Sequence, residues 1–207
     1  MKKGTFDIEA QKLVAQAASW RLASVLLERP RPEWKAAISL LLPEVGDRKL
    51  STFAKEAEQG SEENYHRLFG PGGAASPREV SYCGFEDPGR LMAELQSFYH
   101  AFSYLPRREE SIDHVSVEAG FVGYLFLKEA YARKRGDSAA AEITKSARTR
   151  FTQEHLSRCA GGIHDRLTEG PAYLRNVISW LVKKSPGRTA EKAGHDPCKN
   201  AECCTLS

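Results

Sequence analysis

The chain has 207 residues, of which 41% are hydrophobic and 28% are charged. This length is enough for one domain with a sizeable core, and the composition is typical of a water-soluble globular protein. Thirty basic and 27 acidic residues leave a formal net charge of +3, which is too small and too evenly mixed to favour nucleic-acid binding.

The start of the chain, MKKGTFDIEA, has two lysines but no apolar stretch after them. The sequence therefore predicts no secretory signal, and no apolar run approaches the ~20 residues that a membrane-spanning helix needs. Five cysteines, three of them in the last ten residues, do not resemble a disulfide framework. We expect a cytoplasmic protein with reduced thiols.

Apolar residues recur at helical spacing along most of the chain. The early helices are expected over residues 7–29, from Pro32 to about Leu42, and over 48–59 and 61–69. The next should begin after Asp87-Pro88, because a capping residue followed by proline is typical of a helix start. Its apolar face is predicted to be Leu91, Leu95, Phe98, Phe102 and Leu105. A helix from Val115 onward and further helices over 138–149, 150–168 and 171–184 complete the series.

Strand signals are nearly absent, since Val115-Ser116-Val117 is the only alternating β-branched trio and helical spacing follows it directly. The segment GPGGAASP (70–77) predicts a loop. The sequence thus predicts an all-α, single-domain helical bundle over residues 1–187. A polar, cysteine-containing tail over 188–207 is expected to be flexible.

Metal binding remains an alternative. Glu63 and His66 match one half of a di-iron Glu-x-x-His motif, but the sequence has no second Glu-x-x-His. His114 and Glu118 could share a helix face, although two ligands do not close a site. In the tail, a soft metal could be held by His195, Cys198, Cys203 and Cys204. A helical metal-dependent oxidoreductase or metal-binding protein is therefore the alternative function, although no motif of nucleophilic catalysis or phosphate binding is present.

The stretch ESIDHVSVE (110–118) gathers Glu110, Asp113, His114 and Glu118 just before and within a long helix. The aromatic residues near it in the expected fold are Tyr65, Phe69, Tyr82, Phe85, Tyr99, Phe102 and Tyr104. Carboxylates beside an aromatic-lined groove would suit a peptide that carries arginines next to a hydrophobic stretch, because the planar guanidinium binds a carboxylate through two parallel hydrogen bonds. Core packing and helix capping are the competing explanations for the same residues.

Three segments resemble the TorD/DmsD/NarJ family of molybdoenzyme maturation chaperones, the redox enzyme maturation proteins. They are ENYHRLFGPGGAASPREVSY (63–82), FYHAFSYLPRREESIDHVSVEAGF (98–121) and FTQEHLSR (151–158). The matching positions are Tyr65, Leu68, Phe69, Gly70, Pro71, Pro77, Glu79, Tyr82, Tyr99, Glu110, Asp113, His114, Glu118, Phe151, Glu154, His155 and Leu156. Two positions depart from the family pattern: Ile112 replaces a proline, and Arg78 stands where an aromatic residue is usual.

The resemblance implies a TorD-like fold of about ten helices and no catalysis. Members bind the twin-arginine-type signal peptide of a molybdenum-cofactor oxidoreductase subunit and hold the subunit for cofactor insertion, assembly or export. It further implies that Asp113 and Glu110, with Glu118, take the arginines, and that His114 orients Asp113 or gives binding a pH dependence near neutrality. The expected peptide-binding residues are Tyr65, Leu68, Phe69, Pro71, Pro77, Glu79, Tyr99, Phe102, Glu110, Asp113, His114 and Glu118.

The same resemblance implies no stably bound cofactor, so that the molybdopterin cofactor would be handled through the client. It implies no catalytic or metal-binding residues, no nucleic acid and no stable membrane insertion. The expected partner is the catalytic subunit of a molybdopterin oxidoreductase. A monomer and a domain-swapped dimer both remain open.

Overall fold

The computed structural model describes residues 3–106 and 109–187, with side chains from residue 8 onward. Within these ranges the regular structure is helical, apart from one isolated β-bridge between Arg78 and His114. None of the described helices combines the length and the apolar character that crossing a membrane would require. The all-α prediction is confirmed.

Nine α-helical segments follow one another in the described residues. They are α1 (Lys3–Leu26), α2 (Trp34–Leu41), α3 (Arg48–Glu56), α4 (Glu62–Phe69), α5 (Pro88–Ala101), α6 (Val115–Lys134), α7 (Ser138–Phe151), α8 (Ser157–Arg166) and α9 (Ala172–Lys184). A π-helical turn, Thr152–Leu156, joins α7 to α8 without a break. The described residues therefore form eight separate helices, fewer than the ten or so that were expected.

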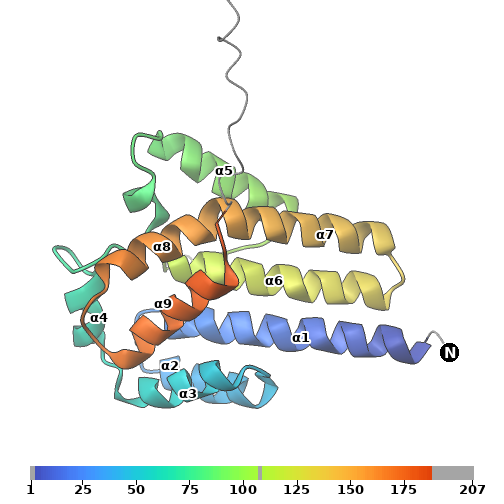
Figure 1. The fold of residues 1–207 in the computed structure, drawn as a ribbon, viewed down its shortest axis with the longest axis horizontal. Coiled ribbons are helices and arrows are strands. Elements are labelled where there is room, and N and C mark those ends of the chain that lie inside the picture. Colours follow the sequence, from blue (N-terminus) through green and yellow to red (C-terminus); the bar gives the residue numbers. More distant parts are fainter. Residues whose placement is uncertain (1–2, 107–108, 188–207) are drawn as a thin grey trace, which may run out of the picture.

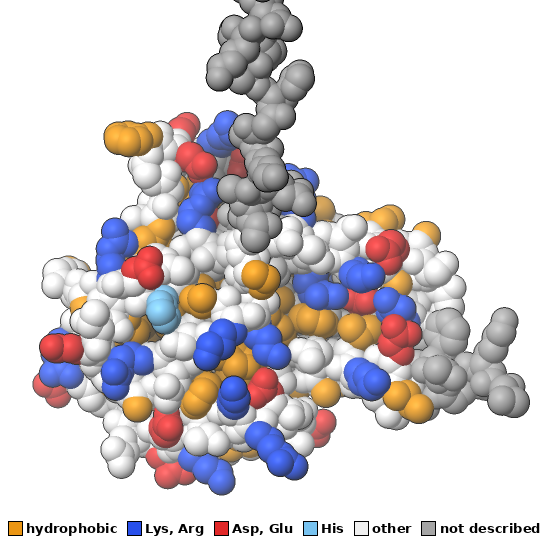
Figure 2. Space-filling model, in the orientation of Figure 1, with side chains coloured by type: hydrophobic (Ala, Val, Ile, Leu, Met, Phe, Trp, Pro, Cys, Tyr) orange, Lys and Arg blue, Asp and Glu red, His pale blue; other side chains and the backbone are white. Residues whose placement is uncertain are grey.

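The long helices α1 and α6 run antiparallel, side by side, through the middle of the molecule (Figure 1). The continuous α7–α8 helix packs on α6 on the side away from α1, and α5 lies beyond it. Helices α2 and α3 cover α1 from the opposite side, while α9 packs against both α8 and α3. Basic and acidic side chains are interspersed on the face in Figure 2, as the small net charge suggests.

Tryptophan side chains tie the outer helices to α1. The rings of Trp20 and Trp180 meet edge to face with centroids 4.9 Å apart, which fixes α9 against α1. The Trp34 indole N–H donates to the Val25 carbonyl oxygen at 2.6 Å, so α2 is held to the end of α1 by a buried hydrogen bond. Such a bond satisfies a polar group that would be costly to bury alone.

Helix α5 ends four residues earlier than its apolar spacing predicts. It stops at Ala101, and Ser103 adopts the left-handed region with φ 54°, which turns the chain away. Leu105 is consequently 87% exposed, so its assignment to the apolar face of this helix is wrong. Pro106 directly follows and disfavours a helical conformation at Leu105, which is the local reason for the early stop.

The left-handed Ser103 yields a first prediction. An L-residue in this region is strained, whereas glycine adopts it freely, although glycine also loses more entropy on folding. We expect Ser103→Gly to raise the free energy of unfolding by about 0.5–1 kcal/mol. Urea denaturation followed by circular dichroism measures this change. Ser103→Val should be destabilised in the same assay, and equal stability of the two variants would contradict the assignment.

Candidate functional site

A groove of about 540 Å³ opens between the end of α4, the glycine-rich loop 70–77 and the segment 109–114 before α6. Six of the twelve predicted site residues line this groove. They are Tyr65, Phe69, Pro71, Pro77, Glu110 and His114. Residues that lie 49 positions apart in the sequence, such as Tyr65 and His114, are thereby brought together, so we take this groove as the candidate site.

Asp113 ties the two sides of the groove together from beneath. Its side chain is fully buried and accepts hydrogen bonds from Arg78 Nε at 3.0 Å and from the Val80 N–H at 3.3 Å. The backbone around it is paired as well, because the Glu79 N–H donates to the Asp113 carbonyl and the Val115 N–H to the Pro77 carbonyl, each at 2.8 Å. A buried carboxylate with this many donors is a structural anchor.

Arg78 is a site residue that sequence reasoning did not assign. Its side chain lines the groove and is 46% exposed, and it contacts Asp113 through Nε. The sequence did carry one signal for Arg78: a cation stands at a position where the family usually has an aromatic residue. Because 35 positions separate the two residues, the sequence alone did not pair this cation with Asp113.

His114 caps the start of α6 and is held on both ring nitrogens. Its Nδ1 accepts from the Ser116 N–H at 3.1 Å, so Nε2 carries the proton and meets the Tyr65 hydroxyl at 3.0 Å. Burial lowers the pKa of His114 to about 4, against the pull of neighbouring Asp113 in the opposite direction. The ring is neutral near pH 7, and the expectation that it changes charge near neutrality is wrong.

Two acids form the rim of the groove: Glu109 is exposed and Glu110 is partly buried. Glu109 contacts Arg31 Nη1 at 2.6 Å, and Glu110 lies 3.8 Å from Arg31 Nη2. Partial burial raises the pKa of Glu110, although the nearby Arg31 and Arg29 counteract this effect. Sequence reasoning singled out Glu110 but not its neighbour Glu109, which lies in the same charged run.

Glu118 lies behind the groove in a second carboxyl cluster. Both of its oxygens are buried without a well-placed hydrogen-bond partner among the described residues. Burial, and then the negative charges of Glu79 and Asp113, raise the pKa of Glu118 well above its ordinary value. Glu79 in turn contacts His155 Nδ1 at 3.2 Å and Arg158 Nη1 at 3.6 Å. The fold therefore favours the protonated form of Glu118.

The remaining predicted residues do not offer a peptide-binding surface in this conformation. Glu79, Tyr99, Asp113 and Glu118 are buried, and so is Leu68. Phe102 lies at the end of α5, where its carbonyl accepts from the Tyr124 hydroxyl, outside the groove. The aromatic lining expected for the groove is thus reduced to the edges of Tyr65 and Phe69, while Tyr99 packs in the core.

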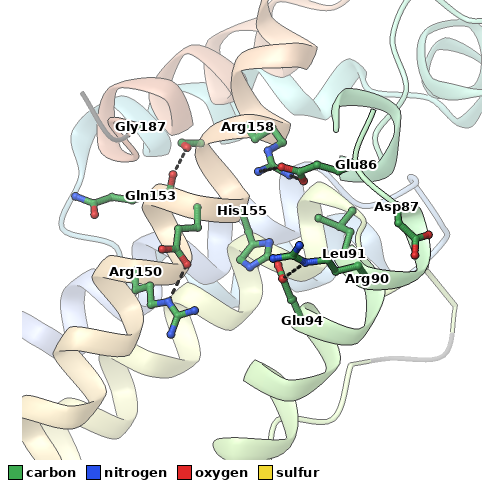
Figure 3. A pocket seen from close by; sticks show the side chains of 12 residues that line it. Glu86, Asp87, Arg90, Leu91, Glu94, Arg150, Gln153, His155, Arg158 and Gly187 are labelled. Atoms are coloured by element: carbon green, nitrogen blue, oxygen red, sulfur yellow. Dashed lines mark hydrogen bonds and ion pairs between the residues drawn. The ribbon is translucent and has the colours of Figure 1, made fainter. Parts of the chain in front are cut away.

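A second hollow, of about 620 Å³, lies between the start of α5 and the π-helical turn (Figure 3). Three arginines surround it, and each contacts an acid: Arg90 with Glu94 at 3.0 Å, Arg150 with Glu154 at 2.8 Å, and Arg158 with Glu86 at 2.8 Å. Its charges therefore largely neutralise one another. His155 lines it from the π-helical turn and links it to the buried Glu79.

The two histidines proposed for the metal alternative both line the groove but have different partners. His66 is half-exposed and contacts Glu62 at 3.4 Å, whereas the ring of His114 is engaged by Tyr65 and Ser116. Within residues 3–106 and 109–187 no group of three or more His, Cys, Asp or Glu side chains is placed to hold a metal ion. The tail residues His195, Cys198, Cys203 and Cys204 lie outside the described residues.

Comparison with known proteins agrees with this geometry. The family model of the nitrate reductase delta subunit matches residues 28–163, which include all twelve predicted site residues. The chain belongs to this family, which is one of the TorD/NarJ-type redox enzyme maturation protein families, and the resemblance seen in the sequence is confirmed. This membership places it among chaperones of molybdoenzyme maturation rather than among catalytic enzymes. No curated protein and no solved structure gives a significant match.

The lowered pKa of His114 predicts a pH-dependent stability. The unfolded chain binds a proton at this position below about pH 6.5, whereas the folded chain does so only below about pH 4. The stabilisation that His114 provides is therefore fully present above pH 6.5 and declines as the pH falls toward 4, by on the order of 3 kcal/mol. Chemical denaturation of the wild type and of His114→Gln at pH 4 to 8 isolates this contribution. A constant difference between the two proteins over that range would contradict it.

The raised pKa of Glu118 predicts the opposite slope. The folded chain holds this proton at pH values where the unfolded chain, with a pKa near 4.5, has lost it, so Glu118 reduces stability increasingly as the pH rises. We expect Glu118→Gln to gain stability over the wild type by up to about 1.4 kcal/mol per pH unit above pH 4.5. The measurement is the free energy of unfolding between pH 5 and 8. A difference between the two proteins that stays constant from pH 5 to 8 would show that Glu118 is ionised in the fold.

Proposed function

We propose that this protein is a cytoplasmic chaperone that binds the N-terminal, twin-arginine-type signal peptide of a molybdenum-cofactor oxidoreductase subunit. It holds that subunit for cofactor insertion and for assembly or export. The observation that carries this proposal is the groove itself, where the accessible carboxylates of Glu109 and Glu110 adjoin Pro71 and the edge of Phe69.

An arginine side chain suits this rim better than a lysine side chain. Its planar guanidinium can donate two parallel hydrogen bonds to one carboxylate, whereas an ammonium group acts as a point charge. Glu109 and Glu110 already receive a guanidinium from within the chain, that of Arg31. One guanidinium thus already lies within ion-pair distance of the rim, which supports the proposal, and a client arginine would share or replace this internal partner.

In the proposal, Asp113 acts through Arg78 and not on the peptide directly. Asp113 is fully buried and fixes Arg78 by its Nε, while the half-exposed guanidinium lines the groove. Arg78 would donate to backbone carbonyls of an extended peptide, which is a recognition that does not depend on the peptide's side chains. The buried acids Glu79 and Glu118 then support the fold beneath the groove.

The proposed partner is the catalytic subunit of a molybdopterin oxidoreductase. The proposal assigns no cofactor to the chaperone itself, so molybdopterin would be handled through the client. Binding of moderate strength, in the micromolar to high-nanomolar range or ~8 to 9 kcal/mol, would suit a chaperone that has to release its client.

The test uses calorimetric titration with the N-terminal peptide of a molybdoenzyme encoded beside this gene, and with the same peptide carrying lysines in place of both arginines. We expect one-to-one binding that weakens with the lysine peptide. The double variant Glu109→Gln, Glu110→Gln should bind the arginine peptide about ten- to a hundredfold more weakly, because charge-assisted hydrogen bonds are lost.

The matched control is Glu58→Gln with Glu142→Gln, which neutralises two exposed acids outside the groove. The control should bind like the wild type, and both double variants should keep the wild-type helicity and melting temperature. Equal affinity of the groove variant and the control for the arginine peptide would refute peptide capture by this rim.

A further inference from the structure

The candidate groove, called the first groove from here on, is one of three neighbouring hollows on the surface. The hollow beside the π-helical turn is not one of them. A narrow hollow of about 40 Å³ shares Glu109 and Glu110 with the first groove. A third hollow, of about 460 Å³, shares Arg21 and Tyr104 with the narrow one. The three hollows are therefore neighbours with shared walls, and together they form a track from the acidic rim to the outer side of α1 and α6.

The third hollow has a floor of small residues. Ala17 and Ala18 of α1 and Gly120 and Gly123 of α6 line it, so the two helices approach closely there. A Cβ on Gly123 would lie 3.1 Å from the Cβ of Trp20, and one on Gly120 would lie 2.9 Å from the Tyr104 hydroxyl. The small residues are thus required for the packing, and they leave a shallow depression above it.

The walls of the third hollow are apolar and exposed. Leu105 is 87% exposed, Leu127 49% and Val14 43%, and they come from three different elements. Leu105 is held out of the core by the left-handed turn at Ser103. Apolar side chains that gather around one depression mark a binding surface more often than scattered ones do.

Most of the charged side chains of the track line the first groove and the narrow hollow. Glu28, Glu109 and Glu110 lie at the narrow hollow, and Glu109 and Glu110 continue into the first groove. Arg21, which contacts Glu28 at 3.2 Å, lies where the narrow hollow meets the apolar one. Arg31 also lines the narrow hollow and Glu44 the third, so the two ends of the track differ in how many charged side chains they hold and in how much apolar surface they offer. The track therefore distinguishes the charged end of a ligand from its apolar end.

We propose that the third hollow binds the hydrophobic segment that follows the arginines in the same peptide. This proposal rests on the proposed function, and it adds a site for the apolar half of the ligand. The first groove offers less apolar surface than the third hollow, and its aromatic side chains Tyr65 and Phe69 are at most 7% exposed. The order of acids and then apolar walls along the track matches a ligand with arginines first and an apolar run after them.

The test combines Leu127→Asp and Leu105→Asp, made separately, with three peptides: the complete signal peptide, its arginine-bearing half, and the complete peptide with serines in place of its apolar run. Each variant should weaken binding of the complete peptide at least tenfold. Each should bind the other two peptides as the wild type does, because neither presents an apolar run to the third hollow. Ile143→Asp is the matched control, since Ile143 is 65% exposed on α7, outside the track.

The outcomes separate this proposal from the one on which it rests. If the wild type binds none of the peptides, peptide capture itself is wrong. If the complete peptide binds, depends on Glu109 and Glu110, and is unaffected by both aspartate variants, capture stands and the third hollow is not its apolar site. If the aspartate variants instead dissociate a dimer in sedimentation and leave peptide affinity unchanged, a second copy of the chain occupies the hollow and the proposal is overturned.

Discussion

The ion pair between Arg78 and Asp113 is the interaction on which the geometry of the groove depends. An ionised carboxylate in a fully buried position is tolerated only when donors surround it, and Asp113 receives them from Arg78 and from the Val80 N–H. Backbone hydrogen bonds on either side of Asp113 join the same two segments. The loop after α4 and the start of α6 are therefore held in one arrangement, and the walls of the groove are those two segments.

The second carboxyl cluster, Glu79 and Glu118, is buried, and its burial costs free energy that the rest of the fold has to offset. Glu79 is oriented by His155 from the π-helical turn, and Glu118 lies beside it, fully buried and without good hydrogen bonds. Burial, and then the like charges of Glu79 and Asp113, disfavour the ionised form of Glu118, which is why its pKa is raised. A π-helical turn inserts an extra residue into a helix and redirects its side chains. Here the turn carries His155, the residue that contacts Glu79.

The sequence predicted the positions of the helices well because local residues mark their ends. Asp87-Pro88 begins α5, and Asp137 begins α7 by accepting the Ala140 N–H. Leu105 was misplaced because spacing alone does not show a left-handed residue such as Ser103. The π-helical turn was missed for a related reason, since no local pattern distinguishes it from an α-helical turn.

The site was only partly predictable because spacing shows which side chains share a face but not which face is covered. The spacing of Tyr65, Phe69 and Tyr99 would suit the wall of a groove, but their side chains are buried in the core. The acids lie close together in the sequence, yet Asp113 and Glu118 are internal and Glu110 is partly exposed at the rim. That division depends on contacts between distant residues, such as Asp113 with Arg78 and Glu118 with Glu79, which no local pattern reveals.

Arg31 has a consequence for how a client would be held and released. Since its guanidinium already lies 2.6 Å from Glu109, an arginine arriving at the rim exchanges one ion pair for another and does not neutralise a free charge. The net gain from such an exchange is smaller than that from pairing an isolated carboxylate, because the ion pair with Arg31 is lost in the exchange. Under the proposed function the rim therefore contributes selectivity for arginine with limited affinity. The apolar end of the track would supply the remaining affinity, and withdrawal of the hydrophobic segment into the folding client would then suffice for release.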